Sequence, residues 1–149
     1  MAINLRAMQL ADVPQVYAIE CSISPDPWGE KLFSDCISVG YSCWVLESDD
    51  DMTVVGYGLL SCAASEAHIL NIAIRPDMQH AGLGRRLMQH LIQQAQLLQA
   101  DMVYLEVRVT NAPAINLYKQ LSFIEIGSRK GYYARGRERE DAFVLALGL

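Results

Sequence analysis

The fold is decided by one stretch, Arg75-Pro76-Asp77-Met78-Gln79-His80-Ala81-Gly82-Leu83-Gly84-Arg85-Arg86. The apolar residues 67–74 before it predict a strand that stops at the proline. Leucines spaced three or four apart after it predict a helix over residues 82–99. The start of a helix offers unpaired backbone N–H groups with a partial positive charge, and glycines let a bulky anion approach them closely. The stretch therefore predicts a strand, a phosphate-type anion site and a helix, in that order.

The spacing of the glycines narrows the kind of phosphate ligand. A Walker loop needs GxxxxGK followed by Ser or Thr, which is absent here, and a dinucleotide loop needs a third glycine where Leu87 stands. The pattern that remains is Gln79-x-x-Gly82-x-Gly84, followed by Arg85 and Arg86. Arginines in a first helical turn oppose the helix dipole at a cost of about 0.3–1 kcal/mol, and a bound anion would offset that cost. The alternative is an ordinary glycine turn that starts a helix.

A second informative stretch runs from residue 102 to residue 123. Residues 102–109 alternate, with valines and leucine on one face and Tyr104, Glu106 and Arg108 on the other, which predicts a strand. Asn111 as a cap and Pro113 in the first turn predict a short helix over 112–121. Glu106 is therefore expected on one face of a central strand.

The rest of the chain supplies the remaining elements of one domain. The predicted strands are 3–8, 41–47, 53–63, 67–74, 102–109, 123–127 and 142–147. The first predicted helix begins at Asp12, and three further helices are predicted over 29–38, 82–99 and 112–121. A polar loop is predicted between the last two strands, with residues 135–140 exposed to solvent. This order predicts a mixed α/β sheet covered by helices, and 149 residues suit a single domain over 1–149.

Composition and charge disfavour several classes of protein. A formal net charge of −5 argues against general nucleic-acid binding, and the apolar stretch 52–64 is too short and interrupted to cross a membrane. The four cysteines form no CxxC pair and no metal-ligand spacing with the histidines, so no metal is predicted and the thiols are interpreted as buried or incidental. His68 and His90 are interpreted as structural. Residues 1–6 lack a signal-peptide pattern, which indicates a cytoplasmic protein.

Together these motifs resemble the GCN5-related N-acetyltransferase (GNAT) family. Gln-x-x-Gly-x-Gly between a strand and a helix is similar to the family's pyrophosphate-binding pattern, and residues 105–123 are similar to its strand, its Asn-capped helix and its Tyr-x-x-x-Gly-Phe ending. The resemblance covers residues 2–147 and is densest over 66–123. It implies acetyl-coenzyme A (acetyl-CoA) as co-substrate. It also implies a mostly antiparallel sheet of about seven strands, splayed between the fourth and fifth strands and flanked by about four helices.

Five separated motifs resemble one branch of that family, the bacterial enzymes that acetylate the N-terminal alanine of a small-subunit ribosomal protein. They are Pro27-Trp28, Asn71–Ile74, Leu105–Arg108, Tyr132-Tyr133 and Arg139–Ala142. The resemblance thus implies acetyl transfer to the N-terminal amine of a protein. Two other functions remain open: the same fold acetylating a lysine side chain or a small amine, and a non-catalytic acyl-CoA sensor.

The resemblance also implies roles for two side chains in a direct attack of the amine on the thioester. Glu106 is the predicted general base, acting directly or through water, and its place in the sheet is expected to raise its pKa. The alternative is a salt bridge to Arg108 or a solvated carboxylate. Tyr118 is the predicted general acid at the departing sulfur, with core packing as the alternative.

The predicted binding residues surround that pair. The cofactor contacts are Ile72, Ala73, Ile74, Gln79, His80, Ala81, Gly82, Leu83, Gly84, Arg85 and Asn111, and the peptide walls are Trp28, Tyr132 and Tyr133. Backbone N–H groups of residues 72–74 are expected to polarise the carbonyl where the family's strand bulges. Capping alone explains Asn111 equally well, and each aromatic residue also suits core packing.

Two residues depart from the family's pattern. Ser122 stands where a glycine usually precedes Phe123, and it is expected to cost stability or to shift the helix end. His80 stands where an arginine is common, which is expected to weaken one phosphate contact or to make it depend on pH. Neither departure removes a predicted catalytic group.

Overall fold

A computed structural model describes residues 2–149, and Met1, the first residue of the predicted single domain, lies outside the described residues. The strands are β1 (Ile3–Ala7), β2 (Ser42–Ser48), β3 (Val54–Ala63), β4 (Glu66–Ile74), β5 (Met102–Arg108), β6 (Ile124–Arg135) and β7 (Glu138–Gly148). The helices are α1 (Val13–Ile23), α2 (Glu30–Ser38), α3 (Leu83–Leu97) and α4 (Ala112–Gln120), with short 3-10 turns η1 (Leu10–Asp12) and η2 (Pro76–Met78).

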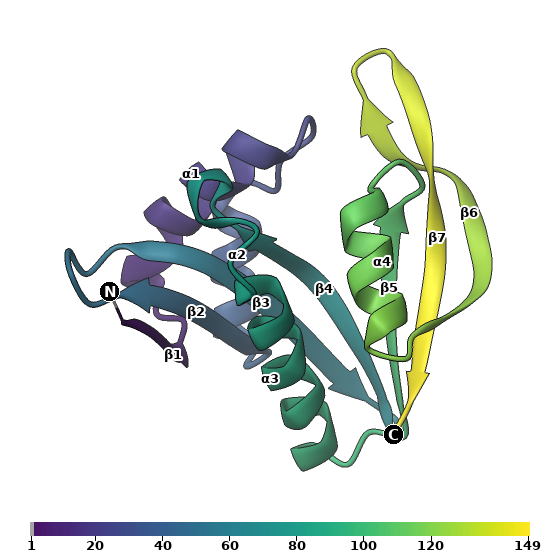
Figure 1. Cartoon of the computed structure of the whole chain (residues 1–149), viewed down its shortest axis with the longest axis horizontal. Helices are drawn as coiled ribbons and strands as arrows, with labels where there is room; N and C mark the ends of the chain where they lie inside the picture. Colours follow the sequence, from purple (N-terminus) through teal and green to yellow (C-terminus); the bar gives the residue numbers. More distant parts are fainter. Residues whose placement is uncertain (1) are drawn as a thin grey trace.

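All seven strands form one sheet in the order β1-β2-β3-β4-β5-β7-β6, and β4–β5 is its one parallel pair within residues 2–149. That pair joins Glu66–His68 only to residues 102–104, after which the two strands diverge (Figure 1). On the other edge of β4, Leu70 has no partner because the register with β3 shifts there. A bulge of this kind bends a strand and strengthens its twist. The prediction of a mixed sheet that is splayed between its fourth and fifth strands is therefore confirmed.

The helices cover both faces of the sheet and leave the splay accessible. α3 and α4 lie on the near face in Figure 1, and α1 and α2 lie on the far face against β2–β4. Gly58 lets α3 approach β3 closely, because a Cβ atom there would lie 2.9 Å from the Leu91 side chain. The core that α1 and α2 form includes no residue of β5, β6 or β7, so neither helix covers that half of the far face.

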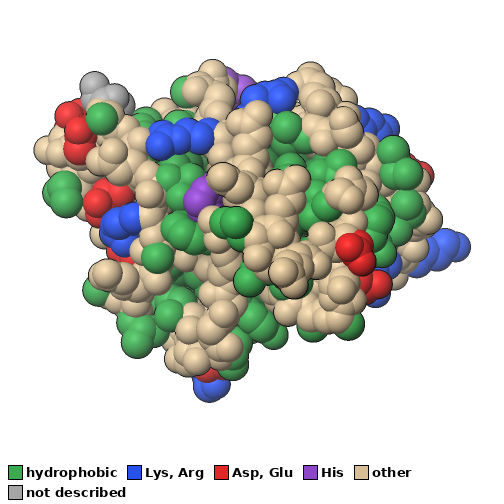
Figure 2. Space-filling view, turned by 90° about the horizontal axis from the view of Figure 1, so that it is seen from below, with side chains coloured by type: hydrophobic (Ala, Val, Ile, Leu, Met, Phe, Trp, Pro, Cys, Tyr) green, Lys and Arg blue, Asp and Glu red, His purple; other side chains and the backbone are tan. Residues whose placement is uncertain are grey.

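The surface shows no single field of charge on the face seen in Figure 2, where Lys, Arg, Asp and Glu side chains are scattered among apolar and neutral ones. None of the helices in residues 2–149 has the length and apolar character of a membrane-spanning segment. All four cysteines are free thiols, and Cys36 and Cys43 are buried.

The last hairpin differs from the sequence-based prediction. Instead of short strands joined by a long polar loop, β6 and β7 are long and meet at a turn formed by Gly136 and Arg137. β6 is an edge strand whose polar residues face water, and two register shifts interrupt its alternation, so its sequence does not show the pattern of a half-buried strand. The prediction that residues 135–140 form a solvated loop holds for exposure at residues 135–139 but not for conformation, because β7 begins at Glu138. It also fails at Glu140, which is 7% exposed and contacts Arg108 and Thr110.

α4 ends in a Schellman motif that fixes the position of Tyr118. The Phe123 N–H donates to the Tyr118 carbonyl and the Ser122 N–H donates to the Lys119 carbonyl, both at 3.0 Å. The rings of Tyr118 and Phe123 pack with centroids 6.1 Å apart. Ser122 takes the left-handed conformation at φ 75°, the conformation in which a glycine carries no steric cost.

We expect Ser122→Gly to raise the free energy of unfolding by about 0.5–1 kcal/mol. Relief of left-handed strain, worth roughly 1–2 kcal/mol, is partly offset by the greater entropy of an unfolded glycine, roughly 0.4–1 kcal/mol. Urea denaturation with an unchanged m-value measures the change. Ser122→Ala is the matched control, since it keeps the strain; a glycine variant no more stable than the alanine variant would contradict the prediction.

Candidate active site

Two cavities meet at the opening between β4 and β5. The first, of about 360 Å³, lies at the start of α3 and against α4. The second, of about 500 Å³, lies between α1, the loop that follows it, and β5 with the β6–β7 hairpin. The residues that line both are Ile23, Ile72, Ala73, Asn111 and Tyr118. Two ligands placed one in each cavity would therefore meet at the splay of the sheet.

The backbone at the start of α3 is arranged as an anion site. Gly82 is the N-cap at φ 79° with no side-chain cap, and His80 is also left-handed at φ 64°. The hydrogen bonding of the helix begins with the Arg86 N–H to the Gly82 carbonyl, so the N–H groups of residues 83–85 come before the first helical bond. Alternating left-handed residues and free N–H groups form a concave nest for anions.

Gly84 supports the same interpretation. A Cβ atom at this position would lie 3.5 Å from Leu117, an ordinary packing distance, so packing against α4 does not demand a glycine. Gly84 lines the first cavity, where a missing side chain leaves backbone accessible to a ligand.

The side chains of this loop divide into those that hold it and those that face the cavity. Gln79 Nε2 donates to the Ile74 carbonyl at 3.0 Å, which ties the loop to the end of β4. Arg85 lines the cavity and donates to Gln120, whereas Arg86 turns away and donates to the Ile3 carbonyl at 2.6 Å. All the predicted cofactor residues line the first cavity except Ala81, which is exposed.

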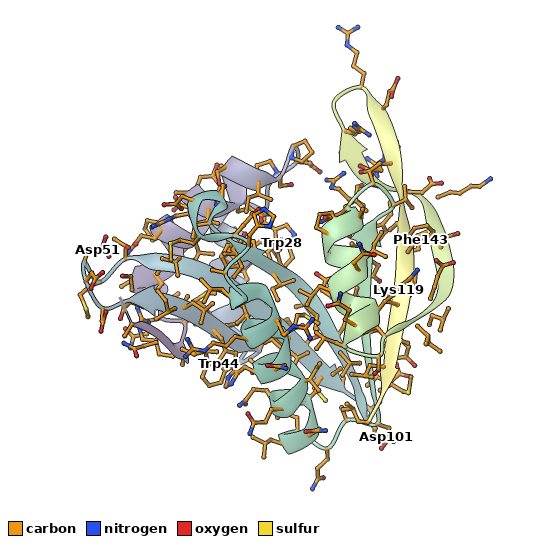
Figure 3. The ribbon with its side chains drawn as sticks, viewed as in Figure 1. Trp28, Trp44, Asp51, Asp101, Lys119 and Phe143 are labelled. Carbon is orange, nitrogen blue, oxygen red and sulfur yellow. The ribbon has the colours of Figure 1, made fainter. Side chains whose placement is uncertain are left out.

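The second cavity brings together the three predicted aromatic walls from opposite sides. Trp28 comes from the loop after α1 and lies beside the opening between the halves of the sheet (Figure 3), and Tyr132 and Tyr133 come from β6. The rings of the two tyrosines pack edge to face, with their centroids 4.9 Å apart. Arg108 lies 4.3 Å from the Tyr133 ring and 3.2 Å from Glu140, so the hairpin wall is held by a cation–π contact and an ion pair.

Glu106 lies in the second cavity, and its partners differ from those predicted. Its side chain is 7% exposed; Oε2 lies 2.5 Å from His68 Nε2, and Oε1 lies 3.6 Å from Arg129 Nε. The alternative of a salt bridge to Arg108 was wrong, because Arg108 pairs with Glu140. Burial acts to raise the pKa of Glu106, but the hydrogen bond and charge of His68 and the charge of Arg129 outweigh burial and lower it. The expected rise in this pKa was therefore wrong.

Tyr118 and Asn111 lie at the junction of the two cavities. Tyr118 is 7% exposed, and burial raises its pKa to about 12. Asn111 caps α4, with Oδ1 accepting from the Ala114 N–H at 3.4 Å, so the capping interpretation holds while the residue also borders both cavities. Beyond His68, no strand pairs with the edge of β4 that faces β5 in the described chain, so backbone there borders the opening.

Comparison with known proteins fits this geometry. Residues 13–123 match the Acetyltransferase (GNAT) family. The chain belongs to the GNAT family. This GNAT chain is 36% identical over 144 residues to the ribosomal protein bS18-alanine N-acetyltransferase of Escherichia coli strain K12, covering 97% of the chain and 96% of the relative. It is 32% identical over 159 residues to the N-alpha-acetyltransferase of Sulfurisphaera tokodaii, covering 98% of the chain and 93% of that relative.

A solved structure agrees with both relatives. The crystal structure of the ribosomal-protein-S18-alanine N-acetyltransferase from Escherichia coli has a TM-score of 0.90 to this chain at 34% identity, covering 99% of this chain and 94% of that one. The fold is thus the GNAT fold, and the chain is an acyltransferase of that family.

Two side chains of this GNAT site were missed by sequence reasoning. His68 was interpreted as structural, yet it contacts Glu106; only the parallel pairing of His68 with Tyr104 brings it there. Glu20 was not considered, yet it is 5% exposed and lines the second cavity. The one available signal was a glutamate within the apolar face of a predicted helix, which often marks a buried carboxylate with partners.

Proposed function

We propose that this enzyme transfers an acetyl group from acetyl-CoA to the N-terminal α-amine of a protein, and that its substrate is an N-terminal alanine of a small-subunit ribosomal protein. The observation that carries the proposal is that the cavity at the start of α3 and the aromatic-walled cavity meet at Tyr118, with Glu106 in the lining of the second. The similarity of the whole chain to an enzyme named for alanine at the N-terminus of bS18 supports the choice of substrate.

The residues present suit acetyl-CoA in the first cavity. The free N–H groups at the start of α3 suit its diphosphate, and the helix has no acidic residue in its first turn to repel it. The apolar lining by Ile72, Leu83 and Leu117 suits the pantetheine arm. With the diphosphate at Gly82, the arm extends toward the splay, where backbone of β4 is open to pair with it.

The second cavity suits the amine. An α-amine has a pKa of about 7.7–8, so roughly a tenth of it is neutral at pH 7, whereas a lysine amine at about 10.4 is almost entirely charged. A carboxylate of low pKa is a weak base, but a weak base suffices for an amine that is already partly neutral. Glu106 accepts the amine proton, directly or through water, as nitrogen attacks the thioester carbon and coenzyme A leaves as a thiolate.

Tyr118 acts at the departing sulfur. Its pKa of about 12 lies well above the roughly 8.5 of an ordinary thiol, so complete transfer of its proton to the thiolate is uphill by roughly 5 kcal/mol. A hydrogen bond from the hydroxyl to the developing negative charge needs no such transfer and is strongest in the transition state. Tyr118 therefore stabilises the thiolate, and water supplies its proton after release.

His68 and Arg129 are expected to keep Glu106 ionised. In His68→Gln the positive charge is lost while a neutral hydrogen bond is kept, so the pKa of Glu106 should rise from its lowered value toward or above the ordinary 4.5. A pH titration of the Glu106 carboxyl carbon by NMR measures it. Arg129→Gln should give a smaller rise, since Arg129 is more distant and its side chain is 57% exposed. An unchanged or lower pKa in His68→Gln would contradict the assignment.

A peptide panel tests the proposed function. Purified enzyme, acetyl-CoA and peptides beginning with alanine, each carrying an internal lysine, are incubated together, and tandem mass spectrometry locates the acetyl group. We expect it on the α-amine of the alanine peptides, with little transfer to lysine, polyamines or free amino acids. Acetylation of lysine alone would overturn N-terminal specificity, and binding of acetyl-CoA without transfer to any amine would favour a sensor.

A further inference from the structure

Glu20 is a buried carboxylate with no basic partner. It is 5% exposed, as buried as Asp12 and Glu140. Each of those pairs with an arginine, whereas no ion pair of Glu20 is formed within the same residues. Desolvating a carboxylate without a counter-charge is costly, so a position of this kind calls for an explanation.

Neutral donors hold Glu20 in a fixed orientation. Oε1 accepts from the Tyr57 hydroxyl at 2.6 Å and from Asn71 Nδ2 at 3.2 Å, and Oε2 accepts from the Trp28 backbone N–H at 2.9 Å. An ionised carboxylate has about four acceptor positions, so one remains on Oε2. Glu20 is one of the residues that line the second cavity, so its carboxylate borders the space a ligand would occupy.

The charge of the cavity favours a cation beside Glu20. Arg108 is the one Lys or Arg side chain in its lining, and it is engaged by Glu140, the Ala134 carbonyl and the Tyr133 ring. Glu20 approaches from the α1 side and Glu106 from β5. His68 pairs with Tyr104, and continuing that register two residues along each strand would place Leu70 opposite Glu106. Asn71, which donates to Glu20, is the next residue after Leu70. Two carboxylates thus face the cavity from opposite sides of the splay.

We infer that Glu20 binds the protonated α-amine of the incoming protein and so selects substrates with a free N-terminus. This inference rests on the proposed function and adds a second carboxylate to it, with a different role. Glu20 holds the ammonium group through charge before the reaction. The ammonium then loses one proton to water and so regains the lone pair that attacks, and Glu106 receives the second proton as the C–N bond forms. The hydrogen bonds from Tyr57 and Trp28 already fix the carboxylate, so the side chain loses little conformational entropy when the amine binds.

A pair of peptides separates this role from a structural one. One peptide begins with alanine; the other carries a propionyl group in place of the alanyl residue and lacks only the amine. Both are titrated into the enzyme–coenzyme A complex at pH 7, which holds no acetyl group to transfer. The wild-type enzyme should bind the amine peptide more tightly, and in Glu20→Gln that preference should fall by about tenfold or more, the usual loss for a charged hydrogen bond.

The variant is designed to fold. Glutamine keeps the shape of Glu20; its oxygen can accept from the Trp28 N–H, while its NH₂ group donates to the Tyr57 hydroxyl and to a rotated Asn71 amide. Tyr57→Phe is the matched control, because it removes a donor from the same network and keeps the carboxylate, so the preference for the amine should persist.

Each outcome decides the inference. An equal loss of affinity for both peptides in Glu20→Gln would show that Glu20 acts only through the Trp28 loop, and would overturn the inference. An unchanged preference for the amine peptide would also overturn it. A wild-type enzyme that does not distinguish the two peptides would overturn it even if the variant did not fold. If the wild-type enzyme acetylates alanine peptides in any of these cases, the proposed function stands and only the role of Glu20 fails; if it acetylates no peptide N-terminus, both fail.

Discussion

Glu106→Gln is expected to lower kcat for an alanine peptide by a factor of about 10²–10⁴, the usual contribution of a positioned acid or base. Glutamine retains the size of the side chain and a hydrogen bond to His68, but it accepts no proton. The affinity for acetyl-CoA should stay within about twofold, because Glu106 lines the peptide cavity and not the cavity at the start of α3. Steady-state kinetics and calorimetry of the same preparation measure both quantities.

A second carboxylate provides the control for that experiment. Glu47 pairs with Arg6 at 2.8 Å and lines neither cavity, so Glu47→Gln should leave kcat unchanged. A wild-type kcat in Glu106→Gln would remove Glu106 from the mechanism. A loss of acetyl-CoA affinity as large as the loss of kcat would show a general distortion of the site.

Tyr118→Phe is expected to lower kcat by about 10²–10³, the usual cost of removing one donor from a developing negative charge. The ring keeps its packing against Phe123, so α4 should remain folded. The deficit should shrink with an acetyl donor whose leaving thiol has a lower pKa, since such a thiolate needs less stabilisation. Turnover with a series of acetyl thioesters measures this dependence.

An exposed tyrosine serves as the comparison. Tyr41 is 43% exposed and lines neither cavity, so Tyr41→Phe should behave as the wild-type enzyme with every donor. If Tyr118→Phe lost the same activity with every thioester, the hydroxyl would not act at the leaving group.

Local signals in the sequence predicted most of the fold and the loop that borders the first cavity. The loop at Gly82 and Gly84 combines special backbone positions with a helix start, and such positions are fixed by residues close in sequence. Asn111 and Pro113 marked the start of α4 for the same reason. Ser122 was expected to cost stability or to shift the helix end. It takes the left-handed conformation, because the helix ending around Tyr118 needs that conformation whichever residue provides it.

Features set by long-range contacts were not predictable in this way. The pKa of Glu106 depends on His68, which lies 38 residues before it in the sequence, and on Arg129, which comes from β6. Sequence spacing does not reveal either contact. The part of the β6–β7 hairpin between residues 127 and 142 was predicted as a loop because its edge strand is polar and bulged. Glu20 meets Tyr57 and Asn71 only after α1 packs on the sheet.

Calorimetric titration of the wild-type protein with acetyl-CoA tests most directly whether the start of α3 and the splay of the sheet form a coenzyme A site. We expect saturable binding of one acetyl-CoA per chain, weakened in Gly82→Val, where a branched side chain would occupy a left-handed position at the anion site. Folded protein that releases no heat and shows no saturation with acetyl-CoA would contradict it.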